Sequence, residues 1–252
     1  GKIVNVSDIK NKNILADKTI HEFFFDGNLV YVCCGFGIVV IDIDRVEVKD
    51  TYIIGDNGSY LNVNDIAIYN GKLYAATSHG IYFADHGNNN LADFSQWTHD
   101  TSINNDELNF SEIETFNGKL LANYSENKYG TDTMFVYDGI KWDYHENINH
   151  LIKRDVRTYD DKLMLVEHYS LKIMNKNNSI INSFSTDLEP FSAVYDKSDD
   201  VYWIGDRYNS LVKMFGDKTC EYVRFNGPYS VDAFEMKAGS NQLWVASGGY
   251  TS

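Results

Sequence analysis

The feature that most constrains this chain is a segment pattern that returns about every forty residues. Residues 62–85, NVNDIAIYNGKLYAATSHGIYFAD, hold two apolar runs divided by Asn-Gly, then a glycine and a third apolar run. Aligning similar segments by their second run gives steps of 43, 47, 43, 38 and 42 residues between the anchors Val30, Leu73, Leu120, Leu163, Val201 and Leu243. Repeats of this length are typical of β-propeller blades, each a four-stranded antiparallel sheet.

Each repeat divides into strand-sized pieces. Asn-Gly between two apolar runs predicts a tight hairpin, because both central residues must adopt positive φ. A third run and a more polar fourth run complete the unit, and only residues 91–97 suggest a helical turn. The sequence therefore predicts an all-β chain with five complete blades over residues 19–225, a lone strand at 2–9 and a two-stranded start of another blade.

The organisation around these blades leaves alternatives open. We expect residues 1–252 to form one partial propeller domain excised from a longer multidomain protein, in which the propeller has seven blades, with any targeting signal upstream. The lone first strand either completes a sixth blade with the last two strands, or the chain is an open arc. A sandwich or a solenoid of similar strands is the alternative fold.

Composition narrows the class of partner. Hydrophobic residues make up 43% and aromatics 14% of the chain, which suits strands and a core. A net charge of -14 argues against binding to nucleic acid, and no apolar run reaches the roughly 18 residues of a membrane-spanning helix. Cys33, Cys34 and Cys220 show no disulfide or zinc spacing and are predicted to be small core residues. No motif for a cofactor is present, so none is expected.

Acidic residues recur at the start of the predicted innermost strands. Counting back eight positions from the first four anchors gives Glu22, Asp65, Glu112 and Asp155, whereas the last two repeats give Ala193 and, with a longer turn, Ala233. Four carboxylates near one axis predict a candidate metal site, with calcium as the possible ion, because hard cations prefer oxygen ligands. The alternative is that each acid accepts hydrogen bonds from backbone N–H groups of the neighbouring blade.

Other candidates favour structural interpretations. Asp42 and Asp44 are predicted to lie on one solvated strand face, and the oxygen-rich loop 55–65 is predicted to form turns rather than a calcium site. The long connections carry aromatic residues that could stack on sugars or on a partner, namely Trp97, Trp142 and Tyr129, whereas Trp203 and Trp244 are predicted to be core residues.

Several strings of the chain resemble a known family. NVSDIKNKNILADKTI, CCGFGIVVIDIDRVEVKDTYIIGDNGSYLNVNDI and YAATSHGIYFADHGNNNLADFSQW resemble the N-terminal β-propeller region of the PorZ family, components of type IX secretion in Bacteroidetes. The resemblance is densest over residues 1–100, and GFGIVV followed by VKDTY is its most specific part. Blades containing GIY also occur in the propellers of two-component regulators.

The resemblance implies a non-enzymatic scaffold at the cell surface, associated with the outer membrane, or in the periplasm. Family members work with the sortase PorU in a complex that joins secreted cargo to anionic lipopolysaccharide. A chain of charge -14 repels such a glycan unless local basic residues intervene, and Lys153, Arg154 and Arg157 form the best basic cluster, so we expect them to be the ligand-binding residues.

Two other functions stay open from the sequence. One is the periplasmic sensor propeller of a hybrid two-component regulator that binds a glycan fragment. The other is a carbohydrate lyase or hydrolase that uses the four acids of the inner strands. The absence of a catalytic motif favours a binding protein over an enzyme.

Overall fold

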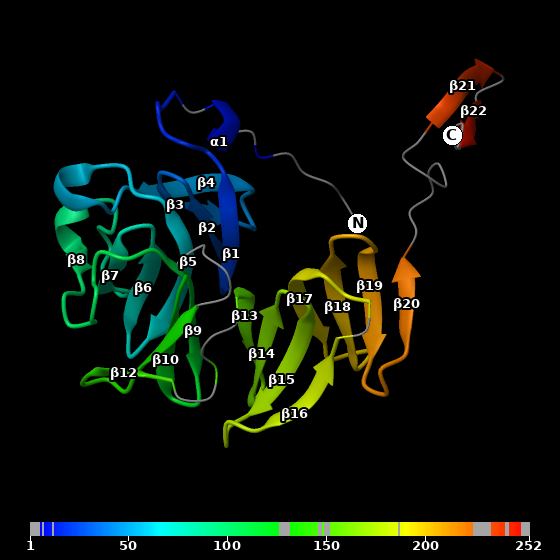
Figure 1. Ribbon diagram of the computed structural model, residues 1–252. Coiled ribbons are helices and arrows are strands. Elements are labelled where there is room, and N and C mark those ends of the chain that lie inside the picture. The colour runs from blue at the N-terminus through cyan, green and yellow to red at the C-terminus, as the bar shows by residue number, and fades with distance from the viewer. Residues whose placement is uncertain are drawn as a thin grey trace.

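The chain folds into a succession of small antiparallel sheets, and the predicted all-β propeller is confirmed (Figure 1). The computed structural model describes residues 6, 8–11, 13–125, 132–145, 148, 152–185 and 187–223, with the backbone of strands 233–239 and 242–247. Within these residues, five four-stranded sheets each run as a meander of consecutive strands, which makes a five-bladed arrangement. A sixth, two-stranded sheet follows.

The strands match the predicted pieces of each repeat. Blade 1 contains β1 (Ile20–Asp26), β2 (Leu29–Cys34), β3 (Gly37–Asp42) and β4 (Glu47–Tyr52). Blade 2 contains β5 (Val63–Tyr69), β6 (Lys72–Thr77), β7 (Gly80–Asp85) and β8 (Thr98–His99). Blade 3 contains β9 (Phe110–Phe116), β10 (Lys119–Tyr124), β11 (Thr133–Tyr137) and β12 (Trp142–Tyr144).

The remaining sheets continue in the same order. Blade 4 contains β13 (Lys153–Tyr159), β14 (Lys162–Glu167), β15 (Ser170–Asn175) and β16 (Ile180–Phe184). Blade 5 contains β17 (Pro190–Asp196), β18 (Val201–Asp206), β19 (Ser210–Phe215) and β20 (Cys220–Val223). The last sheet pairs β21 (Ala233–Gly239) with β22 (Gln242–Ser247).

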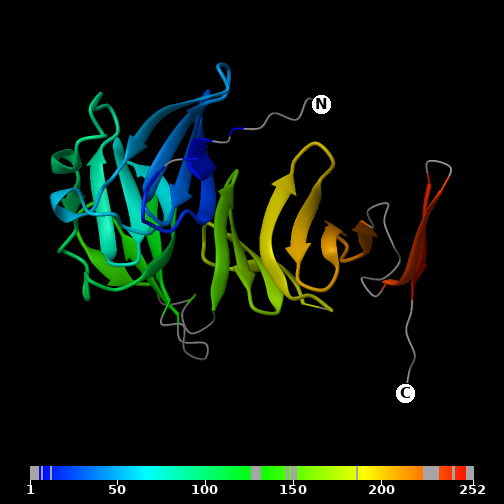
Figure 2. The same ribbon diagram turned by 90° about the horizontal axis from the view of Figure 1, so that it is seen from above.

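The hydrophobic core consists of layers between successive blades. Tyr31 and Ile38 of blade 1 pack with Ile66 of blade 2, and the other face of blade 2 packs on blade 3 through residues such as Ala67 and Phe110. Further clusters join blade 3 to blade 4 and blade 4 to blade 5. Each sheet from blade 2 to blade 4 is thus buried on both faces, which explains the near-continuous apolar runs of the second strands; Figure 2 shows the sheets following one another.

Turn chemistry explains the hairpins between first and second strands. Asn70 and Gly71 have φ of 48° and 74°, and Asn117 and Gly118 have φ of 51° and 71°, as the Asn-Gly signal predicts. Gly37 begins β3 at φ 141°, and a Cβ there would collide with the carbonyl oxygen of Tyr52. The glycine at the start of the third strand of blade 1 therefore allows a close approach of the backbone.

A β-bulge recurs in the first strand of every blade. The pairing register shifts directly before Glu22, Asp65, Glu112 and Asp155, and at the same place in β17 and β21. Bulges of this kind change the direction in which neighbouring side chains point. The bulge therefore fixes which residue of each blade occupies the position of the acids.

The register corrects two assignments made by counting. In the strand pairing, the residue of blade 5 that corresponds to the anchor Leu73 is Tyr202 and not Val201. The reason is that the turn between β17 and β18 is two residues longer than an Asn-Gly turn. Ser192 therefore occupies the place of Asp65 in blade 5, where Ala193 was predicted. In β21 the same place belongs to Glu235 rather than Ala233, so no longer turn is needed there.

The ends and connections show two differences from the prediction. The strand expected at residues 2–9 is not seen in its described part, since Asp8–Asn11 form the single helical turn α1; residues 2–5 and 7 lie outside the described residues. A 3-10 turn, η2 (Phe94–Gln96), confirms the helical segment, with Asp93 accepting a hydrogen bond from the Ser95 N–H. A second such turn, η1 (Asp56–Gly58), lies in the loop 55–65.

Candidate functional site

The inner strands bring their acids to one place. Glu22, Asp65, Glu112 and Asp155, from β1, β5, β9 and β13, line a cavity of about 50 Å³ with Glu114 and Arg157. These residues are far apart in the sequence, and the bulges deliver them to the same level of four strands. We call these six residues the acidic centre.

Backbone N–H groups of the following blade occupy several of these carboxylates. Asp65 accepts hydrogen bonds from the N–H of Ile66 at 2.7 Å and from that of Ile113 in blade 3 at 2.9 Å. Asp155 accepts one from Ala193 of blade 5 at 3.2 Å, and Glu114 accepts one from Thr158 of blade 4 at 3.1 Å. The acids therefore join consecutive blades, as the structural interpretation of the repeat predicted.

Arg157 supplies the positive charge of the acidic centre. Its Nε lies 3.0 and 2.9 Å from the two carboxylate oxygens of Asp155, and its Nη2 lies 2.8 Å from Oε2 of Glu22. The guanidinium thereby connects blade 4 to blade 1, which are 135 residues apart at this contact. A planar guanidinium suits such a pair of carboxylates.

Burial dominates the protonation of the acidic centre. It raises the pKa of Asp65 and of Glu112 well above the usual range, and the nearby carboxylates add to the shift of Glu112. Burial also raises the pKa of Glu114 to about 7, against two backbone hydrogen bonds that lower it. The raised pKa values reflect the cost of burying five acids close together around one arginine.

The acidic centre does not have the arrangement of a metal site. Among the described residues, no group of three or more His, Cys, Asp or Glu side chains could hold a metal ion. The calcium interpretation of Glu22, Asp65, Glu112 and Asp155 therefore gains no support from their geometry. Arg157 and backbone N–H groups already contact oxygens of Asp65, Asp155 and Glu22 that a cation would need.

The basic cluster predicted from the sequence is divided among three environments. Lys153 is buried, where desolvation lowers its pKa, although it has polar partners. Arg157 belongs to the acidic centre, and Arg154 extends toward Glu189 of blade 5. Because neighbours on a strand point to opposite faces and a bulge redirects Arg154, the three cations share no surface.

Sequence reasoning missed a second charged cluster, formed around Glu189. Oε1 of Glu189 lies 3.0 Å from Nη2 of Arg154, 2.9 Å from Nη1 of Arg207 and 3.6 Å from Nε2 of His168. Its hydrogen bonds with Arg207 and Arg154 lower the pKa of Glu189 to about 2.

Three aromatic rings surround these charges. Arg154 lies 4.2 Å above the ring of Phe191, Arg207 lies 5.6 Å from the ring centre of Tyr208, and His168 lies 4.1 Å from the ring centre of Tyr169. We call Glu189, the two arginines, His168 and the three aromatics the Glu189 patch. The sequence does contain a signal for this patch. The dipeptides His168-Tyr169 and Arg207-Tyr208 each combine a basic residue type with a tyrosine, and they occupy equivalent turns of consecutive repeats.

Two of the aromatic residues that could stack on a sugar or a partner are buried instead. Trp97 donates a hydrogen bond from Nε1 to the Leu91 carbonyl at 2.9 Å, and Trp142 donates one to Oδ2 of Asp100 at 2.9 Å. Both rings are buried, so they do not form a stacking surface. Tyr129 lies outside the described residues, as does the side chain of Trp244.

The predicted burial of other residues is confirmed for some of them and wrong for others. Cys33 and Cys34 are buried free cysteines, as predicted, whereas Cys220 is half-buried. Trp203 is also only half-buried, with the ammonium of Lys213 above its ring at 5.5 Å. Asp42 is buried and accepts a hydrogen bond from the N–H of Arg45, so it does not share a solvated face with Asp44.

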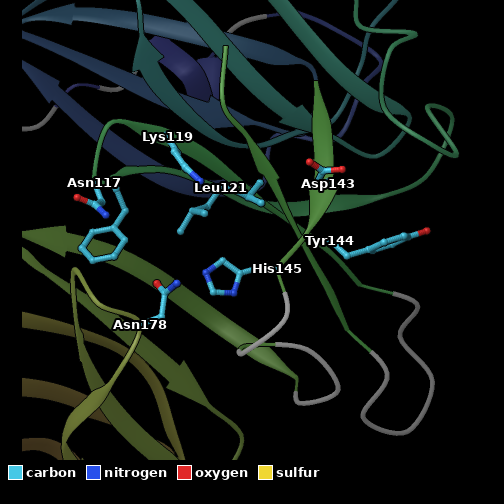
Figure 3. A pocket seen from close by; sticks show the side chains of 9 residues that line it. Asn117, Lys119, Leu121, Asp143, Tyr144, His145 and Asn178 are labelled. Carbon is cyan, nitrogen blue, oxygen red and sulfur yellow. The ribbon is translucent and has the colours of Figure 1, made fainter. Parts of the chain in front are cut away.

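Larger hollows lie between the outer parts of the blades. One of about 530 Å³ is lined by residues of blades 3 and 4, and Figure 3 shows Leu121, His145 and Asn178 gathered around it while the ring of Tyr144 points away. A second, of about 350 Å³, lies between β16, β19 and β20 and includes Phe184 and Met214. The residues of the Glu189 patch line neither hollow.

The meander of four-stranded sheets around an inner polar centre defines a β-propeller protein. The resemblance stated from the sequence is confirmed at its N-terminal part: residues 1–98 match the family described as the N-terminal beta-propeller domain of PorZ of the type IX secretion system. None of the curated proteins matches the chain significantly.

Solved structures share the fold at low identity. PorZ of Porphyromonas gingivalis, described as an essential bacterial surface component of the type-IX secretion system, superposes with a TM-score of 0.73 at 19% identity, covering 100% of this chain and 32% of that one. The extracellular domains of two putative hybrid two component systems from B. thetaiotaomicron each give a TM-score of 0.58, at 13% and 16% identity, covering 84% and 94% of this chain and 28% and 34% of theirs. The chain thus spans about a third of the length of these proteins.

Within the described part of the chain, no helix reaches the length and apolarity needed to cross a membrane.

Proposed function

We propose that this propeller is a non-enzymatic binding and scaffold module in a cell-surface complex of type IX secretion. The match of residues 1–98 to the PorZ propeller family carries the proposal. The superposition on PorZ over the whole length of this chain agrees with it in fold. The same relatives support a location at the cell surface, at the outer membrane or in the periplasm.

The acidic centre favours a structural role over catalysis. A glycoside hydrolase needs one carboxyl group as acid and another as base or nucleophile, both facing a sugar-sized cleft. Here Asp65 and Glu114 bind backbone N–H groups, Asp155 binds Arg157 as well, and the cavity holds only about 50 Å³. These contacts support a centre that joins blades rather than one that cleaves glycans.

The finer parts of the proposal concern partners. By its resemblance to PorZ, we infer that the full-length protein works with the sortase PorU and helps to anchor cargo to anionic lipopolysaccharide. Arg154 and Arg157 are already paired with acids and Lys153 is buried, so these three residues give the glycan part of the proposal little support.

Affinity purification of the tagged full-length protein from its native envelope tests the scaffold. We expect proteins of the type IX secretion machinery to co-purify, identified by mass spectrometry against an untagged strain. Deletion of the gene should leave cargo unattached to the cell surface. Normal cargo attachment in the deletion strain would contradict the proposal.

The second candidate is a sensor propeller of a hybrid two-component regulator that binds a glycan fragment. The fold shared with the two extracellular domains from B. thetaiotaomicron favours it. Sequencing the gene beyond codon 252 separates the two: a membrane-spanning helix followed by a kinase would replace the scaffold proposal with the sensor.

A further inference from the structure

The Glu189 patch combines exposed aromatic rings with an exposed guanidinium. Phe191, Tyr169 and Tyr208 are 51%, 64% and 75% exposed, and the side chain of Arg207 is 55% exposed. Glu189, by contrast, is 7% exposed at its side chain, so its charge faces inward. Solvent therefore meets rings and a guanidinium, on a chain whose net charge is -14.

Hydrogen bonds of backbone N–H groups hold the residues of the patch in place. The Glu189 N–H donates to Oδ2 of Asp206 at 2.6 Å, and Oδ1 of Asp206 accepts hydrogen bonds from the N–H groups of Tyr208 and Asn209 at 3.0 and 2.9 Å. The Arg207 N–H donates to the Glu189 carbonyl at 3.0 Å. The turn that presents Arg207 and Tyr208 is thus fixed before any ligand arrives, which lowers the entropy lost on binding.

The bulges of two blades build the rest of the patch. Arg154 and Phe191 are the residues inserted by the bulges of β13 and β17, and they pack on each other across the boundary between blades 4 and 5. These two blades lie side by side in Figure 1. The patch therefore draws on two blades and depends on their being held together.

The chemistry of the patch selects its partner. A guanidinium has five N–H donors, and Arg207 uses one of its side-chain donors on Glu189 in the described structure, which leaves others directed to solvent. Arginine and tyrosine are enriched in the cores of protein interfaces, and guanidinium recognises carboxylates by paired hydrogen bonds. Small-ligand sites are concave, whereas these residues line neither of the two larger hollows.

We propose that the Glu189 patch is a docking surface for an acidic protein segment that carries aromatic residues among its carboxylates. Arg207 binds the carboxylates, and Tyr208, Tyr169 and Phe191 pack against the aromatic side chains. This inference names the surface that the proposed scaffold uses, and so it rests on the proposed function.

Binding of a labelled glutamate–tyrosine copolymer to the full-length protein tests this surface, with fluorescence anisotropy as the readout. We expect binding that weakens with added salt, and a loss of about tenfold in affinity for Arg207→Ala and for Tyr208→Ala. Arg154 still pairs with Glu189 in Arg207→Ala, so no buried carboxylate is left alone. Matched controls are Arg45→Ala and Tyr60→Ala, an exposed arginine and an exposed tyrosine elsewhere, which should bind as the unchanged protein does.

Three outcomes would overturn the inference. One is equal affinity in the Arg207 and Tyr208 variants and in their controls. Another is absence of copolymer binding by the unchanged protein. The third is binding of polygalacturonate in place of the copolymer, which would assign the patch to an acidic sugar. If the secretion machinery still co-purifies with the Arg207→Ala protein, the docking role of the patch is contradicted and the scaffold function is not. If the machinery does not co-purify with the unchanged protein, the scaffold function itself is contradicted.

Discussion

The acidic centre and the Glu189 patch use the same kinds of side chain for opposite purposes. In the centre, carboxylates from four blades face one another and bind backbone N–H groups and Arg157. In the patch, a single buried carboxylate gathers cations whose other donors and neighbouring rings face solvent. The comparison teaches that charge density alone does not identify a binding site; what matters is whether the polar atoms are already engaged.

Removing the arginine of the acidic centre should have the largest effect on stability. Arg157→Ala leaves Asp155 and Glu22 without their counter-charge, and we expect the free energy of unfolding to fall by about 3 kcal/mol, since the pair is partly buried. Chemical denaturation of the full-length protein measures this loss. Arg45→Ala removes an exposed side chain whose ion pairs are with Asp42 at 3.8 Å and the exposed Glu47 at 3.5 Å; it is the matched control and should change stability by less than about 0.5 kcal/mol. Equal losses of unfolding free energy in the two variants would contradict a structural role for the acidic centre.

Asp65 offers the next largest effect. Asp65→Ala removes the acceptor of the Ile66 and Ile113 N–H groups, and we expect a loss of about 2 kcal/mol because buried donors are left unsatisfied. Denaturation of this variant beside Asp44→Ala, at an exposed turn position, isolates the contribution of the contact between blades. An unchanged unfolding midpoint for Asp65→Ala would show that the blades do not depend on it.

The raised pKa of Glu114 gives the centre a pH dependence. The folded protein keeps a proton on Glu114 up to a pH of about 7, whereas the unfolded chain releases it near its ordinary pKa. Stability contributed by this group is therefore lost as the pH rises through that window, by about 1 to 2 kcal/mol after allowance for solvent. Glu114→Gln should flatten the dependence between pH 5 and pH 8 measured by denaturation, and an identical slope would contradict the assignment.

The smallest effect on stability is expected at the patch. Arg207 and Tyr208 are exposed, and their replacement by alanine should change the free energy of unfolding by no more than about 0.5 kcal/mol. Thermal melting of the full-length variants checks this. A large loss of stability would show that the patch, like the centre, mainly holds blades together.

Much of the fold could be predicted from the sequence because the repeat carries its own turn chemistry. Asn-Gly turns and the spacing of apolar runs located the first three strands of each blade and brought Glu22, Asp65, Glu112 and Asp155 to one level. Counting failed in blade 5, where a longer turn replaces Asn-Gly and Ser192 takes the place of the acid. Periodicity thus predicts position as long as turn lengths stay constant.

The chemistry of the sites was harder to predict than their positions. Lys153, Arg154 and Arg157 are neighbours in the sequence, yet alternation along a strand and one bulge send them to separate environments. Trp97 and Trp142 follow long connections, yet hydrogen bonds and ring contacts bury them. Some of the deciding contacts, such as Trp142 with Asp100 and Arg157 with Glu22, join different blades, and a pattern within one blade does not contain them.

The most direct test compares Arg157→Ala and Arg207→Ala in the full-length protein, each measured for unfolding free energy and for affinity to the glutamate–tyrosine copolymer. We predict that Arg157→Ala lowers stability and keeps affinity under conditions where the protein is folded, while Arg207→Ala keeps stability and lowers affinity. If both variants changed the same quantity, the division between a structural centre and a binding patch would be contradicted.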